Sequence, residues 1–140
     1  MSVTPGAIDA LVELFRGGLG RLQVLDGPEA AWPSNEFLVV GLSPEDLMVP
    51  ATRLPRGPES TPETAEITCM IRSWTGDTAI RPRRDRAYQV LDSAADLLGA
   101  DPTLGGACGY AEIVGSVYVP SQSQSGVVVD VIFTVRATAF

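Results

Sequence analysis

Apolar residues recur along this chain with two different periods, which predicts a domain built from both helices and strands. A spacing of three to four residues predicts helices over residues 5–16 and 82–98. Alternating or continuous apolar runs predict strands over residues 22–25, 37–40, 66–74, 110–119 and 127–139, with residues 47–52 as a further candidate. Helices and strands in this order predict an α+β fold, in which two main helices pack on an antiparallel or mixed sheet of about four to five strands.

The last predicted strand is the clearest of these elements. From Val127 to Arg136, valine and phenylalanine occupy every second position, and the other face also carries aliphatic residues, with Asp130 the main exception. A strand that is apolar on both faces belongs in the interior of a sheet. We therefore expect it to be central or nearly central, and antiparallel to residues 110–119.

Two segments carry no hydrophobic face of their own. Residues 43–65 contain five prolines, which exclude a central strand or a long helix. Residues 120–126 are rich in serine, glutamine and glycine, and we expect a polar hairpin tip at 121–126 that is too long for a tight turn. Both segments are predicted to project from a single domain, residues 1–140, to become ordered only against partners and to be cleaved readily by proteases.

Composition excludes several classes of protein. Ten arginines and no lysine stand against seventeen acidic residues, a formal charge of −7, which disfavours general binding to nucleic acid. The absence of histidine removes the commonest acid–base catalyst and metal ligand. The two cysteines, Cys69 and Cys108, match no metal-binding spacing, and we expect buried free thiols. We expect neither a signal peptide nor a membrane-spanning segment.

No motif predicts catalysis, and no catalytic residue, cofactor or metal site is expected. Asp92 and Asp96 stand four apart on one helical face, but no third ligand lies at a suitable spacing, so a solvated face is the simpler interpretation. The glycines at 17, 18 and 20 follow a helix instead of a strand and lack the Lys-Ser/Thr of a phosphate loop. The sequence therefore favours assembly over chemistry.

The most unusual feature is a group of arginines at the start of the second helix: Arg81, Arg83, Arg84 and Arg86. The helix dipole makes positive charge unfavourable there. Solvated side chains, contacts with carboxylates of a neighbouring subunit and contacts with nucleic acid are all open, and the net negative charge counts against the last. Nearby in sequence only Asp77 and Asp85 could pair with them. Because Arg84 and Arg86 project about 200° apart, we expect two of the four to be interface residues, Arg83 or Arg84 foremost.

Trp32 is a second candidate for a partner contact. It lies in a polar loop beside Pro33, where a large aromatic side chain is costly unless it packs on something. A partner subunit is one surface on which it could pack.

Several segments together resemble the tail terminator, or tail completion, proteins of long-tailed bacteriophages of actinobacteria, over about residues 7 to 138. They are a short N-terminal helix ending in Phe15-Arg16, Val24-Leu25-Asp26-Gly27-Pro28, Phe37-Leu38-Val39-Val40-Gly41, Ser73-Trp74-Thr75-Gly76-Asp77-Thr78, an Arg/Ala-rich helix with Leu91-Asp92, Leu98-Gly99-Ala100-Asp101-Pro102-Thr103-Leu104-Gly105-Gly106, and two final strands. The Asp-Gly-Pro and Trp-x-Gly-Asp turns are suggestive in combination, although each alone is common.

The resemblance implies a structural virion protein and not an enzyme. Proteins of this family share an α+β fold and form a homohexameric ring that caps the tail tube, ends its polymerisation and joins the tail to the head. The implied partners are other copies of the chain, the tail tube protein and the head–tail connector or stopper protein, while DNA passes through without specific binding. The implied location is the head-proximal end of the virion tail, after assembly in the host cytoplasm.

Two alternatives remain open at this stage. One is another head–tail joining protein, such as a stopper or connector subunit, which would share the fold class and the acidic ring. The other is a small enzyme with a carboxylate metal site around Asp92 and Asp96. Copurification with tails or with filled heads would distinguish the first, and a metal-dependent thermal shift would support the second.

Overall fold

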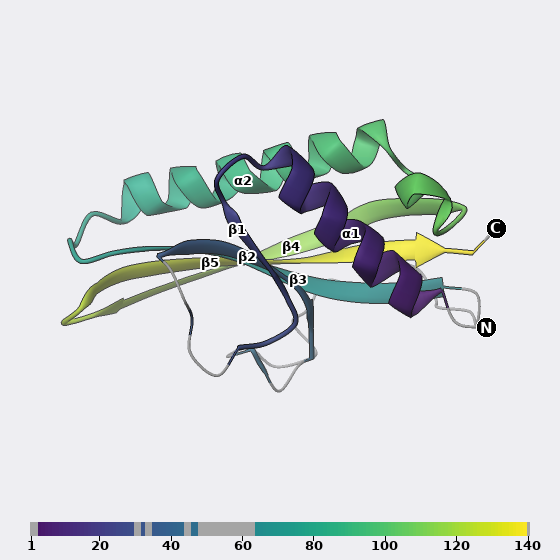
Figure 1. The fold of residues 1–140 in the computed structure, drawn as a ribbon. Coiled ribbons are helices and arrows are strands. Elements are labelled where there is room, and N and C mark those ends of the chain that lie inside the picture. The colour runs from purple at the N-terminus through teal and green to yellow at the C-terminus, as the bar shows by residue number, and fades with distance from the viewer. Residues whose placement is uncertain (1–2, 30–31, 33–34, 44–45, 48–63, 140) are drawn as a thin grey trace.

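The fold has two layers, with both helices packed on the same face of one curved sheet (Figure 1). The computed structural model describes residues 3–29, 32, 35–43, 46–47 and 64–139. In chain order the elements are α1 (Thr4–Gly18), β1 (Gln23–Asp26), β2 (Glu36–Leu42), β3 (Thr64–Thr75), α2 (Ile80–Ala100), the 3-10 turn η3 (Leu104–Gly106), β4 (Tyr110–Ser123) and β5 (Gly126–Thr138).

The sheet is mixed and has five strands in the order β1-β2-β3-β5-β4. Strand β1 runs parallel to β2, and every other neighbouring pair is antiparallel. The predicted α+β class with two helices is therefore confirmed. So is the position of β5, which lies one strand in from the edge and pairs with β3 and β4 along almost its whole length.

The main core lies between the helices and the sheet. Every second residue of β5 from Val127 to Ala137 is buried under the helices, together with Ile67, Cys69 and Ile71 of β3. The helices contribute the apolar stripes expected from their spacing, with Phe15 of α1 in edge-to-face contact with Phe133. This layer holds the largest set of fully buried side chains and supplies most of the hydrophobic stabilisation.

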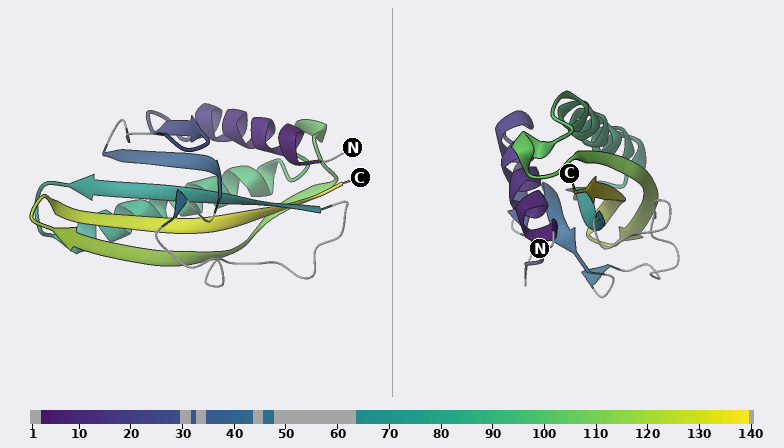
Figure 2. Two further views of the ribbon diagram at one scale, coloured as in Figure 1. Left: turned by 90° about the horizontal axis from the view of Figure 1, so that it is seen from below. Right: turned by 90° about the vertical axis from the view of Figure 1, so that its right-hand side faces the viewer.

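A second, smaller cluster covers part of the opposite face of the sheet. Leu25, Phe37, Val39, Met70 and Ile132 all point away from the helices and are buried. Figure 2 (left) shows this face, on which none of the described residues forms an α-helix. The sheet is thus apolar on both sides near its centre, as the sequence of β5 predicts.

The prediction that residues 121–126 form a connection too long for a tight turn is wrong. Strands β4 and β5 stay paired up to Ser123 and Gly126, so only Gln124 and Ser125 form the turn. Gly126 makes this possible, since its φ of +123° and a clash between any added Cβ and the carbonyl of Thr75 both require glycine. The hairpin end also bonds to the β3–α2 turn, because Val127 N donates to Asp77 O over 3.1 Å.

The proline-rich segment 43–65 lies mostly outside the described residues, including most of the candidate strand at 47–52. Of the residues described, Leu47 is buried in the second cluster, so at this point the segment packs on the sheet instead of projecting from it. Ser43 and Asp46 close a short turn just before it, with Ser43 N and Oγ both donating to Asp46 Oδ2. Thr64 and Ala65 already belong to β3.

Replacing Val131 or Phe133 with aspartate should destabilise the protein by several kcal/mol, because each change buries an unpaired charge and removes apolar contacts. Both side chains are fully buried under the helices. Ser116→Asp is the matched control, since Ser116 is exposed on β4 opposite Phe133. Chemical denaturation measures the effect, and wild-type stability of either core variant would contradict the assignment of this face.

Candidate functional site

The start of α2 concentrates the positive charge of the helix. All four arginines of α2 fall between Ile80 and Arg86, and its first turn contains no acidic residue. The N-cap, Ala79, offers no side-chain oxygen, although its own N–H donates to Asp77 Oδ1 over 3.0 Å. Against the helix dipole, each cation in the first turn costs about 0.3–1 kcal/mol when exposed at low salt. The reason for their presence must lie outside the helix.

For two of these arginines the reason is Glu36, at the start of β2. Arg86 Nε donates to Glu36 Oε2 over 2.6 Å, and Arg83 Nη1 approaches Oε1 over 3.4 Å. Arg83 also donates to the buried hydroxyl of Ser73 on β3 over 3.1 Å. Both guanidinium groups therefore tie the beginning of α2 down to the sheet.

This arrangement supplies a carboxylate beyond Asp77 and Asp85, the only two that lie near the arginines in sequence. Glu36 is about fifty residues away in sequence, so neither spacing nor local pairing signals it. Arg83, the side chain expected foremost with Arg84 at an interface, is only 22% exposed and points into the subunit. Within the described part of the chain, its Nε has no hydrogen-bond partner, which is consistent with a position set by packing.

The other two arginines do not bind Glu36. Arg81 is 83% exposed and lies 3.9 Å from Asp85, itself 67% exposed, in a pair that contributes little to stability. Arg84 is half-buried and forms no ion pair with any residue that the structure describes. Arg81 and Arg84 are therefore the members of the group that remain open to a partner.

Trp32 is accounted for within the chain. Its ring stacks on Phe37 at a centroid distance of 4.9 Å, and the Arg72 guanidinium lies 5.7 Å from its centroid. Arg72 in turn forms a two-pronged ion pair with Asp130, directly opposite on β5, at 2.7 and 2.9 Å. The hydrogen bonds to Asp130 raise the pKa of Arg72 above its ordinary value. This pair explains Asp130, the main exception among the aliphatic positions of β5.

A cavity of about 220 Å³ adjoins this ion pair on the face away from the helices, between Trp32, Leu47 and Met70. Its polar groups are Asp46 and the mutually paired Arg72 and Asp130. Because the guanidinium of Arg72 and the carboxylate of Asp130 already bind each other, this ion pair has the geometry of a structural clamp between β3 and β5.

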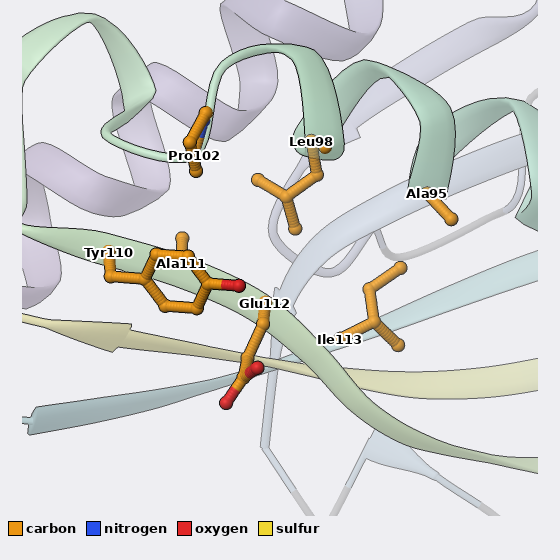
Figure 3. Close-up of a pocket in the computed structure, with 8 residues that line it drawn as sticks. Ala95, Leu98, Pro102, Tyr110, Ala111, Glu112 and Ile113 are labelled. Carbon is orange, nitrogen blue, oxygen red and sulfur yellow. The ribbon is translucent and has the colours of Figure 1, made fainter.

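A larger hollow, of about 290 Å³, lies between the C-terminal end of α2 and the edge strand β4 (Figure 3). Leu98 and Ala95 border it from the helix, and Ala111 and Ile113 from the strand. Tyr110 lines the hollow with a side chain that is 53% exposed. The lining is mostly apolar, so the hollow suits an apolar side chain better than a polar substrate.

The two thiols are buried and unreactive in character. Burial raises the pKa of Cys69 to about 12, and burial also raises the pKa of Cys108. Both cysteines are free, as predicted. A thiol held protonated at neutral pH is neither a nucleophile nor a ready metal ligand.

Asp92 and Asp96 lie on the exposed side of α2, as the solvated-face interpretation predicts. Among the described residues, no three histidine, cysteine, aspartate or glutamate side chains gather in a way that could hold a metal ion. In the same part of the chain, no helix combines the length and the apolar character needed to cross a bilayer.

Comparison with known proteins adds no assignment: no protein-family description matches the chain, and no curated protein matches it in sequence.

Replacing Glu36 with glutamine should lower the free energy of unfolding by about 1–2 kcal/mol, since it leaves two partly buried guanidinium groups without their carboxylate. The control is Asp85→Asn, which breaks only the exposed pair with Arg81 and should cost less than about 0.5 kcal/mol. Denaturant titration of both variants gives the comparison. Equal effects would show that Glu36 does not anchor α2.

Proposed function

We propose that this protein is a tail terminator of a long-tailed bacteriophage: a structural subunit that forms a homohexameric ring at the head-proximal end of the tail. The ring ends polymerisation of the tail tube and joins the tail to the head connector or stopper. The proposal rests on the sequence resemblance, and the structural observation that supports it most is the position of the two turns that carry it.

Both turns are built into the sheet. Asp26-Gly27 closes β1, and Gly27 N donates to Val40 O over 2.8 Å. Gly76-Asp77 connects β3 to α2, and its carbonyl accepts from Val127. These motifs therefore hold secondary structure together, which suits a protein whose role is to assemble.

The charge balance also fits a passage for DNA. A ring of six copies would carry a formal charge of −42, six times −7. An acidic wall repels the phosphate backbone, so DNA can slide past it without adhering. The same argument applies to a stopper or connector ring, so charge alone does not separate these functions.

Location in the particle is the decisive experiment. A reconstruction of the virion should show six copies of this chain between the tube and the head connector, and the chain should copurify with tails that lack heads. A virion reconstruction without a sixfold ring of this chain would contradict the proposal. Copurification with filled heads alone would instead identify a stopper or connector subunit.

The double change Arg81→Glu/Arg84→Glu should block tail completion while leaving the subunit folded, because Arg83 and Arg86 bind Glu36 within the subunit and these two arginines do not. Charge-assisted contacts with a neighbour's carboxylates would become repulsive. The measurements are phage yield and the length of tails by electron microscopy. Arg81→Gln/Arg84→Gln is the milder control, and normal infectious particles from the glutamate variant would leave these arginines as solvated residues.

A further inference from the structure

Strand β4 forms one edge of the sheet, so half of its backbone groups point away from its neighbour β5. The β4–β5 hairpin closes with a two-residue turn, which makes Ser123 and Gly126 a hydrogen-bonded pair. In an antiparallel ladder such pairs alternate with positions whose N–H and C=O groups point to the other side of the strand. Counting back from Ser123, the outward positions are Gln122, Pro120, Tyr118 and Ser116.

Two observations agree with this alternation. Pro120 occupies an outward position, where its missing N–H removes no hydrogen bond to β5. At the start of the strand, Ala111 donates its N–H away from β5, to Pro102 O over 2.7 Å. Between Ser116 and Gln122, by contrast, the described residues make no hydrogen bond on the outer side of β4. This part of the edge is therefore open.

The composition of the open stretch favours pairing with another strand. Proteins usually protect an exposed edge with charged side chains, proline or a bulge, because unpaired backbone groups recruit other strands. From Ile113 to Ser123 the sequence contains no charged residue. A bulge at Val114 and the ring of Pro120 limit the two ends, but the stretch Gly115–Val119 between them has neither protection.

A second copy of this chain offers no good strand for this edge. The other edge strand, β1, has only four residues, and its Val24 carbonyl already accepts from Arg16 Nε and Nη2 over 3.2 and 3.0 Å. Two β4 strands could pair about a two-fold axis, but the only register that avoids the bulge and the proline of both copies pairs Ser116 with Tyr118 and nothing beyond. That short contact would join two chains of charge −7, which repel each other.

We propose that the outer edge of β4, from Ser116 to Gln122, binds an extended segment of another virion protein, which adds a strand to the five-stranded sheet. The main-chain ladder supplies the affinity. Side chains of the added strand lie beside Tyr118 on the helix side and beside Val117 and Val119 on the other side, and all three are half-buried. We therefore expect an uncharged segment with apolar residues on both faces. The choice of a virion protein rests on the proposed function, whereas the open edge does not.

Hydrogen exchange tests the contact directly. In the free protein, the amides of Ser116 and Tyr118 should exchange much faster than those of Val117 and Val119, which bond to β5. In the particle with which the chain copurifies, the peptide 113–119 should gain two protected amides, slowed at least about tenfold. Unchanged exchange in the particle would overturn the proposal. Equal protection in the concentrated free protein would mean self-pairing and would overturn it as well.

A proline at an outward position provides the second test. Ser116→Pro removes one outward N–H and keeps the hydrogen bonds to β5, as Pro120 does in the same strand. It should leave the denaturation midpoint near that of the wild type and lower the yield of completed particles at least about tenfold. Ser116→Lys, which protects the edge by charge without restricting φ, should have the same effect.

Ser116→Ala is the matched control, since it keeps the N–H and loses only the hydroxyl, and it should assemble as the wild type does. Normal particle yield from both the proline and the lysine variants would overturn the docking. The outcomes for docking and function are separable. A sixfold ring in the tail whose β4 edge exchanges as in the free protein leaves the function and removes the docking. An edge protected in filled heads alone leaves the docking and removes the function, and absence of the chain from every virion particle removes both.

Discussion

Strand β5 is the constraint on which the rest of the structure depends. It is paired along nearly its full length with β3 on one side and β4 on the other, and its alternate residues form the floor of the main core. A shift of one residue would turn Val131 and Phe133 away from the helices and bring Asp130 into the apolar layer. The alternation along β5 therefore fixes the register of both neighbouring strands and the face on which the helices must pack.

Ion pairs then hold the elements around this core. They form two groups near the end of β3 that leads into α2, one on each face of the sheet. On the helix side, Arg83 and Arg86 bind Glu36, which ties the start of α2 to β2. On the other side, Arg72 binds Asp130 across the sheet and supports Trp32. Partly buried pairs such as these contribute through geometry and hydrogen bonding more than through charge alone. They position the start of α2, which also carries Arg81 and Arg84.

The absence of a reactive group is consistent throughout the described residues. The thiols are held protonated by burial, the guanidinium and carboxylate beside the smaller cavity satisfy each other, and the larger hollow is mostly apolar.

The sequence by itself determined the elements with a strong period: the two helices, the long strands β3, β4 and β5, the α+β class and the interior position of β5. These follow from spacing, which is local and needs no knowledge of the fold. Only the tertiary structure decided how Arg83 and Arg86 are used, because Glu36 reaches them through the packing of α2 on the sheet. It also decided that residues 121–126 continue the hairpin, since the fit of Gly126 against Thr75 depends on two strands distant in sequence. The contacts of Trp32 with Phe37 and Arg72 were likewise decided by the tertiary structure, because they depend on how the loop packs on the sheet.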